Sequence, residues 1–134
     1  MDATRQRLLP DAAHTRADRR VAYRGMHFAA ELLLAAGAAA VLDAPYNHAV
    51  DREELARIGG GEIRWIECHV SPALAAARLR ARGIPDPTRP DLTEARVRRL
   101  ARSYPYTGRG LTLDTGALTP AECLQRIARY LRER

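Results

Sequence analysis

The order of apolar runs and amphipathic segments constrains the fold of this chain more than any other feature. Three short apolar runs, 39–43, 63–70 and 111–114, alternate with stretches whose apolar residues recur at helical spacing. Strands that alternate with helices form βαβ units, which pack as a parallel sheet covered by helices. We therefore predict an α/β fold with a mainly parallel sheet, in which the run 39–43 is a strand buried on both faces.

Capping residues, glycine and proline set the expected helix boundaries. Helices are predicted at 14–36, 51–58, 71–82, 91–104 and from residue 119 onward, with a proline-rich loop over 83–90. The residues expected to begin these helices are Asp51 with Glu54, Ser71 with Pro72, Asp91 with Glu94, and Thr119 with Glu122.

Helical spacing also predicts which side chains face the core. Two apolar stripes are expected to be buried, one on the first long helix and one on the last. Their members are Val21, Phe28, Leu32 and Ala35 on the first, and Leu124, Ile127, Ala128 and Leu131 on the last.

Length and composition predict one domain over residues 1–134. A chain of this size can bury roughly two-thirds of its unfolded surface. Hydrophobic residues make up 46% of the sequence but aromatic residues only 5%. The core should therefore consist mainly of Ala, Leu, Val and Ile.

All 22 basic residues are arginine, and the net charge is +6. A phosphate-binding loop of the Gly-x-x-x-x-Gly-Lys-Ser/Thr type requires a lysine, so this sequence contains none. The arginines are interleaved with Asp and Glu from Arg5 to Arg134, and no aromatic stacking platform accompanies them. This distribution argues against a dedicated nucleic-acid groove.

The cysteines and the apolar runs predict the compartment. Cys68 and Cys123 lie in no metal-ligand spacing, so we expect two small buried hydrophobic residues in a reducing environment. The longest apolar run, around 32–42, is broken by Gly37 and is too short to span a bilayer. We expect a cytoplasmic protein without a membrane partner.

Four segments, in order along the chain, carry a resemblance to a known family. They are 2–9, 41–45 followed by Arg52, 66–71 leading to Arg78 and Arg82, and 113–115 followed by a closing helix. They resemble the P-loop small-molecule kinases of the zeta-toxin, gluconate-kinase and chloramphenicol-phosphotransferase type, which are AAA-type ATP-binding proteins. The resemblance implies a three-layer P-loop NTPase-like parallel sheet, the cofactors ATP and Mg²⁺, and phosphoryl transfer to a small hydroxylated acceptor.

The phosphate-binding loop of that family has no counterpart in these 134 residues. Family members begin with a strand, the loop, a helix and a second strand, and the first of these strands lies in the middle of the sheet. We therefore expect the domain to be incomplete in its N-terminal βαβ portion, or completed by another polypeptide. The chain alone should bind nucleotide poorly and should not hydrolyse ATP.

The resemblance places acceptor and metal residues in the first half of the chain. Asp2 matches the base that takes the proton from the acceptor hydroxyl, and Arg5 matches the residue that holds the acceptor or the transferred phosphate. Asp43, at the carboxyl end of the predicted strand, would contact Mg²⁺ or its waters. Asn47 and Arg52 follow that strand and are predicted to bind substrate.

Nucleotide residues are placed in the second half. Arg78, Arg82 and Arg89 flank the proline-rich loop and fit a lid over about 78–91, whose guanidiniums clamp the transferring phosphoryl group. Thr115 and Gly116 match the adenine-side loop.

Plainer interpretations of the same residues stay open. Asp2 would serve as a helix N-cap, Arg5 would be an exposed helix arginine, and Arg52 would pair with Glu53 or Glu54. At the level of function, the chain could be a non-catalytic subunit that docks another chain through open strand edges. It could also be a small basic nucleic-acid-binding protein.

Overall fold

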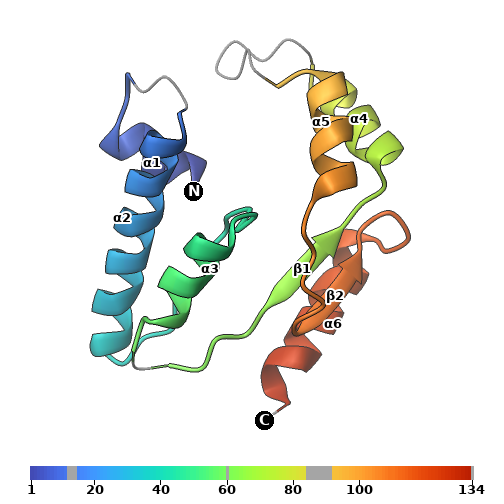
Figure 1. The fold of residues 1–134 in the computed structure, drawn as a ribbon. Coiled ribbons are helices and arrows are strands. Elements are labelled where there is room, and N and C mark those ends of the chain that lie inside the picture. Colours follow the sequence, from blue (N-terminus) through green and yellow to red (C-terminus); the bar gives the residue numbers. More distant parts are fainter. Residues whose placement is uncertain (12–14, 60, 84–91, 134) are drawn as a thin grey trace. The chain divides into compact units, whose positions relative to one another are not determined.

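The structure is a computed structural model that describes residues 1–11, 15–59, 61–83 and 92–133. The chain divides into two compact units, Met1–Ile63 and Arg64–Arg134. Figure 1 colours the first unit from blue to green and the second from yellow-green to red. Each unit is described separately below.

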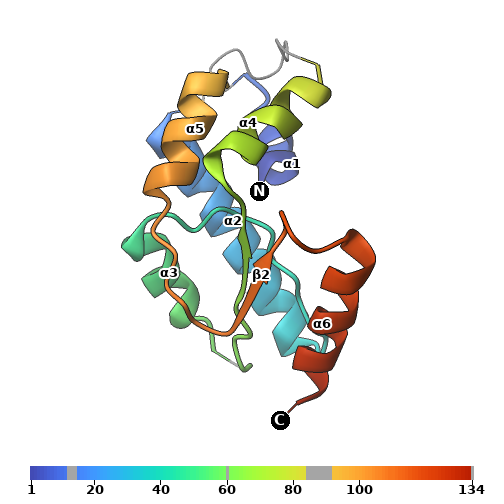
Figure 2. The ribbon, with the colours of Figure 1, turned by 90° about the vertical axis from the view of Figure 1, so that its right-hand side faces the viewer.

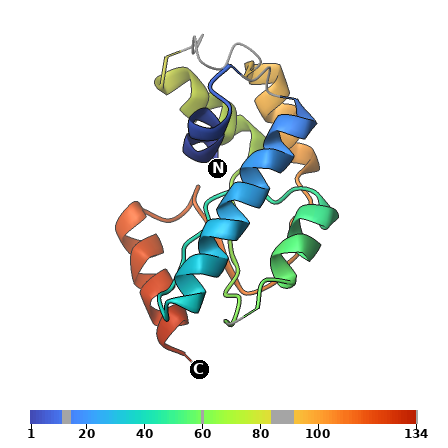
Figure 3. The same ribbon diagram turned by 90° about the vertical axis from the view of Figure 1, so that its left-hand side faces the viewer.

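The first unit is helical. It contains α1 (Asp2–Leu8), α2 (Arg16–Ala35) and α3 (Ala49–Ala56). The helix α1 packs against α2, as Figure 3 shows, and Gly25 permits this approach. A Cβ atom at Gly25 would lie only 2.6 Å from Leu8 Cδ1. A larger residue at this position would require the half-exposed Leu8 side chain to move.

The buried face of α2 is not the predicted one. Five residues of this helix are buried, namely Ala22, Tyr23, Met26, His27 and Ala30. The predicted stripe is exposed instead, since Val21, Phe28 and Leu32 are 43%, 61% and 57% exposed. Helical spacing correctly groups residues on one face, but α2 has two such faces, and only the face that carries Tyr23, Met26 and His27 packs within this unit.

Two further predictions in the first unit are wrong. Residues 39–43 form no strand, and Val41 is 97% exposed. An extended run becomes a strand only when a second backbone pairs with it, and no described segment does so here. The helix α3 begins after His48 rather than at Asp51, so Asp51 occupies the third helical position, where it is buried.

The second unit contains a two-stranded parallel sheet. The strands β1 (Ile66–His69) and β2 (Leu111–Asp114) pair in register, with Ile66 opposite Leu111 and His69 opposite Asp114. Three helices, α4 (Pro72–Ala81), α5 (Glu94–Ser103) and α6 (Pro120–Arg132), complete the unit. The helices α4 and α5 pack side by side, as Figure 2 shows. The α/β class and the parallel pairing are confirmed, while the described sheet has two strands instead of the predicted three.

Helix starts in this unit follow the capping signals closely. Ser71 caps α4 ahead of Pro72, and Thr119 forms a capping box with Glu122 at α6, both as predicted. Thr93 caps α5. The predicted cap Asp91 lies outside the described residues.

Gly110 allows the two strands to meet. Its φ of +67° lies in the left-handed region, and a Cβ atom there would collide with the carbonyl oxygen of Trp65. That oxygen accepts a hydrogen bond from Leu111 N–H at 2.9 Å, the first bond of the strand pair. Any side chain at position 110 would therefore disturb the start of the sheet.

The apolar side of α6 is exposed, contrary to the prediction. Leu124 and Leu131 are 66% and 53% exposed, because within the described residues α6 contacts mainly β2. Cys68 is also exposed and Cys123 is half-buried, so the expectation of two buried thiols is wrong for Cys68. Cys68 is the one exposed residue of β1.

Candidate functional site

Arg78 and Thr115, both predicted to bind nucleotide, meet in the second unit. The Arg78 guanidinium donates a 2.9 Å hydrogen bond from Nη1 to Thr115 Oγ1 and a second from Nη2 to the Thr115 carbonyl oxygen. Thr115 directly follows β2, and its hydroxyl donates to the His69 carbonyl at the end of β1. One threonine thus ties α4 to the carboxyl ends of both parallel strands, which is where ligands bind in open α/β sheets.

The loop after β2 is a tight turn. Gly116 N–H donates to Asp114 Oδ1 at 2.8 Å, and the amides of Ala117 and Leu118 donate to the Asp114 carbonyl. A Cβ atom at Gly116 would lie 3.1 Å from Asp114 Oδ1 and 3.2 Å from Leu74 Cδ2. The predicted pair Thr115 and Gly116 therefore lies on an ordered loop that leaves little room for a side chain at position 116.

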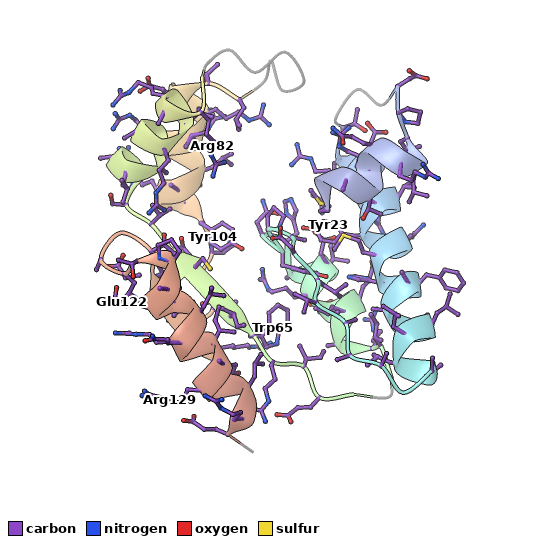
Figure 4. The ribbon with its side chains drawn as sticks, turned by 180° about the vertical axis from the view of Figure 1, so that it is seen from behind. Tyr23, Trp65, Arg82, Tyr104, Glu122 and Arg129 are labelled. Atoms are coloured by element: carbon purple, nitrogen blue, oxygen red, sulfur yellow. The ribbon has the colours of Figure 1, made fainter. Side chains whose placement is uncertain are left out.

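Arg82 lies one turn beyond Arg78 and caps the end of α4, where Figure 4 labels it. Both arginines are exposed and line one cavity of about 240 Å³. The rest of its lining is apolar: Val70, Ala75, Leu79, Leu92 and Val97. Arg80 is not part of this lining and pairs with Glu94 at 3.0 Å. The cavity thus combines an apolar wall with two guanidiniums.

Sequence reasoning missed the side chain that holds the loop before β2. The Glu67 carboxylate accepts hydrogen bonds from Thr107 N–H, Thr107 Oγ1–H and Gly108 N–H at 2.7–3.0 Å. Burial by itself would raise the pKa of Glu67, but these hydrogen bonds outweigh it and lower that pKa. The only signal in the sequence was an acid inside a mostly apolar strand.

An aromatic cluster lies beside Glu67. The His69 ring stacks on Tyr106 with 3.6 Å between centroids, and Tyr104 packs against Tyr106 at 4.6 Å. Burial is the main reason that the pKa of the Tyr106 hydroxyl is raised. The cluster thus packs at the carboxyl end of β1, where the His69 carbonyl accepts the hydrogen bond from Thr115.

In the first unit, the predicted acceptor residue Arg5 is buried. Its side chain on α1 is only 4% exposed, and its Nε atom has no hydrogen-bond partner among the described residues. Burial of this Nε–H without a partner is costly, and a ligand oxygen that accepted its hydrogen bond would remove that cost. The predicted base Asp2 is the first residue of α1, and its side chain lies outside the described part, as does Arg89.

Tyr46 has a left-handed backbone, with a φ of +46°. Its N–H donates to Tyr23 Oη at 3.0 Å, its carbonyl accepts from Arg52, and its hydroxyl lies 3.1 Å from His27 Nε2. A strained conformation of this kind persists only where several contacts fix it. The predicted substrate residue Arg52 therefore holds the Tyr46 turn in this structure, while Glu54, one of its predicted ion-pair partners, bonds Arg20.

The histidine that contacts this turn, His27 of α2, is a packing residue. His27 is buried and stacks on Tyr46, and burial lowers its pKa despite three nearby carboxylates. Burial also raises the pKa of the Tyr46 hydroxyl. Both groups are therefore neutral at physiological pH, which suits a network built on neutral hydrogen bonds.

A second cavity, of about 90 Å³, lies next to this turn. The predicted residue Asn47 lines it together with His48 and Asp51. Its other wall is formed by α2 residues that the predictions did not include, Arg16, Arg19, Arg20 and Tyr23. Figure 4 labels Tyr23, which points from α2 toward α3. The available signal was the spacing of these four residues, which puts them on one helix face.

A family model described as an AAA domain matches residues 1–107. The chain belongs to the AAA domain family. Domains of this family have a P-loop NTPase type of fold and generally bind nucleotide together with Mg²⁺. No curated protein and no solved structure matches this AAA domain significantly. No helix in its described part is long and apolar enough to cross a bilayer.

Metal-binding groups are sparse in this AAA domain. The described residues contain no group of three His, Cys, Asp or Glu side chains that could hold a metal ion. Asp43 is exposed, and its carbonyl oxygen accepts a 2.7 Å hydrogen bond from the Met1 amino group. Proteins often hold Mg²⁺ through one or two carboxylates plus substrate phosphates. Asp43 therefore fits Mg²⁺ only as a single carboxylate that acts with a bound nucleotide.

Proposed function

We propose that this AAA domain acts in nucleotide-dependent phosphoryl transfer, as a small-molecule kinase does, by binding nucleotide phosphates with Arg78 and Arg82. The observation that carries the proposal is the attachment of Arg78 to Thr115 at the carboxyl edge of the parallel sheet. Arg82 lines the same cavity one helical turn later. The family match supports a nucleotide as the ligand.

The chemistry of the cavity suits a nucleotide. A guanidinium has five N–H donors, and Arg78 uses two nitrogens on Thr115, so further donors remain for phosphate oxygens. Thr115 fixes the position of this charge before a ligand arrives, which reduces the cost of ordering it on binding. The apolar wall offers a surface for the base. The fixed charge of Arg78, together with Arg82 in the same cavity, would stabilise the negative charge that develops on the transferred group.

The acceptor side of the proposal depends on the first unit. Asp2 would accept the proton of the acceptor hydroxyl, and the buried Arg5 would hold the acceptor or the transferred phosphate. Asn47, which lines the small cavity of the same unit, would contact the acceptor. Asp43 would supply one carboxylate to Mg²⁺, which neutralises phosphate charge when it is bound with the nucleotide.

These 134 residues contain no lysine and no phosphate-binding loop motif. The arginines can bind and orient phosphates, but the backbone cradle that positions them for transfer is absent from the sequence. We therefore expect weak, salt-sensitive binding of ATP by this chain and no ATP turnover.

The test is a titration of the 134-residue protein with MgATP, followed by calorimetry, at two salt concentrations. Arg78→Gln should weaken binding about tenfold or more, since it removes charge-assisted hydrogen bonds. Arg99→Gln is the matched control, because Arg99 is an exposed arginine of α5 that does not line the cavity. Equal weakening in both variants would contradict the proposal that Arg78 binds the nucleotide phosphates. Rapid ATP turnover by the unmodified chain would contradict only the expectation that these residues need a phosphate-binding loop for transfer.

A further inference from the structure

The small cavity of the first unit has an unusual concentration of positive charge. Arg16, Arg19, Arg20 and Tyr23 have the spacing i, i+3, i+4 and i+7, so α2 presents all four to one side. Three guanidiniums therefore line a space of about 90 Å³. A water requires roughly 10–15 Å³ of such space, so the cavity has room for several waters or for one small ionic group.

The negative charge around this cavity is smaller than the positive charge. Among the described residues that line it, Asp51 is the one carboxylate. Glu54 pairs with Arg20 at 3.3 Å, yet Arg20 Nε is buried and has no hydrogen-bond partner within the described residues. Guanidiniums held close together on one helix face repel one another. An anion between them would relieve this repulsion and would accept a hydrogen bond from the buried Arg20 Nε.

The opposite wall is rigid and also offers donors. Asn47 and His48 follow Tyr46, whose left-handed backbone is fixed by Tyr23, Arg52 and His27. His48 is the N-cap of α3 and makes no capping hydrogen bond through its side chain. Its ring and the Asn47 amide therefore complete a cavity whose shape is set before any ligand binds.

We infer that this cavity binds the oxyanion group, phosphate or carboxylate, of a small molecule. The phosphoryl acceptor is then a hydroxylated compound that carries such a group. Only the identification of the ligand as the acceptor rests on the proposed function. Oxyanion binding itself rests on the arginine-lined cavity. Its volume suits one phosphate or carboxylate group and leaves the hydroxylated part of the ligand outside.

Three related probes test the inference by calorimetry: glycerol 1-phosphate, glycerate and glycerol. The phosphate and the carboxylate probe separate the two possible anions, and glycerol has the hydroxyls without a charge. We expect at least one of the two anions to bind and glycerol not to bind. The double variant Arg16→Gln and Arg19→Gln should weaken anion binding about tenfold or more.

Two further variants make the test specific. Arg24→Gln is the control, because Arg24 is exposed on the same helix and does not line the cavity. It should change binding less than about twofold, as expected for a screened surface charge. Asp51→Asn removes the one carboxylate of the lining and should tighten anion binding several-fold. Circular dichroism of each variant confirms that the helices remain folded.

The outcomes separate this inference from the proposed function. Loss of anion binding in the Arg16 and Arg19 variant, with retention in the Arg24 variant, supports the inference. Absence of anion binding, equal weakening by Arg24→Gln, or equally strong binding of glycerol overturns it. MgATP binding that depends on Arg78 is measured independently, so either idea can fail while the other holds.

Discussion

The two units of this AAA domain place their polar groups in opposite ways. In the first unit, charged and polar side chains are buried, namely Arg5, His27 and Asp51. In the described part of the second unit, the buried residues are Ala76, Leu79 and Leu113, and the polar contacts lie at the ends of strands and helices. The first unit thus fixes its cavity from within, whereas the second fixes an exposed arginine from a loop.

This difference has a consequence for ligand selection. Arg20 Nε at the first-unit cavity is buried and has no hydrogen-bond partner among the described residues, so it favours a ligand that accepts its hydrogen bond, which makes this site selective. Exposed guanidiniums on an apolar cavity tolerate ligands of several shapes, and their contribution falls as salt rises. We therefore expect the first unit to discriminate between acceptors and the second to bind phosphates more generally.

Gly110→Ala should have the largest effect and should damage the second unit. The new methyl group meets the Trp65 carbonyl and also requires a left-handed backbone, so unfolding free energy should fall by about 3 kcal/mol or more. Trp65, the only tryptophan, reports the change by fluorescence during urea unfolding.

Gly108→Ala is the matched control for that clash. Gly108 has nearly the same backbone, with a φ of +66°, but a Cβ atom there meets nothing within 4 Å. The loss should be only about 1 kcal/mol. Equal losses at the two glycines would mean that the close approach to Trp65 does not hold the strands together.

Tyr23→Phe should break the polar interior of the first unit. It removes the hydroxyl that accepts from Tyr46 N–H and leaves that buried amide without its partner, at a cost of about 1–3 kcal/mol. Hydrogen exchange resolves the two units, so protection should fall at Tyr46 and along α2 while β1 and β2 keep theirs. Unchanged protection at Tyr46 would show that the turn does not need this bond.

Acid should loosen the second unit through Glu67. Its pKa is lowered below the ordinary value of 4.5, so the carboxylate stabilises the fold above pH 4.5 and loses that contribution as the pH falls through the lowered value. Glu67→Gln should cost about 1–2 kcal/mol at neutral pH and should flatten this part of the pH profile. Thermal unfolding between pH 3 and 6 provides the measurement, and parallel profiles for both proteins would contradict the assignment.

The smallest expected effects concern the helix N-caps, because one helix in each unit begins with the same kind of capping box. Thr15 with Asp18 at α2 and Thr119 with Glu122 at α6 are both capping boxes. Thr15→Ala and Thr119→Ala should each cost about 1 kcal/mol. Hydrogen exchange at the first turn of each helix tests this, and a loss at only one helix would mean that the other is held by its packing.

Local signals in the sequence predicted much of this fold. Ser71 with Pro72 and Thr119 with Glu122 start helices as expected, since a cap acts within four residues. The strand β2 was also anticipated, and its parallel pairing with β1 follows from the alternation of strands and helices. Arg78 and Thr115 were each assigned to the nucleotide side, but the hydrogen bonds between them were not predicted.

Features that depend on distant partners were not predictable. Residues 39–43 have the composition of a strand, but no described segment pairs with them. The exposure of Phe28 and Leu124 depends on which face of a helix another element covers. The role of Glu67 requires the loop at Thr107, which lies forty residues away in sequence. Composition and spacing contain no information about such partners.

One measurement tests the central claim that the two units bind different anions. Two-dimensional NMR of the backbone amides and arginine Nε–H groups would follow separate titrations with MgATP and glycerol 1-phosphate. MgATP should shift the signals of Arg78, Thr115 and Gly116, and glycerol 1-phosphate those of Arg16, Arg19 and Asn47. If both ligands instead shift the exposed arginines of α5 and α6 to the same extent, binding is a general effect of the positive charge, and the account is wrong.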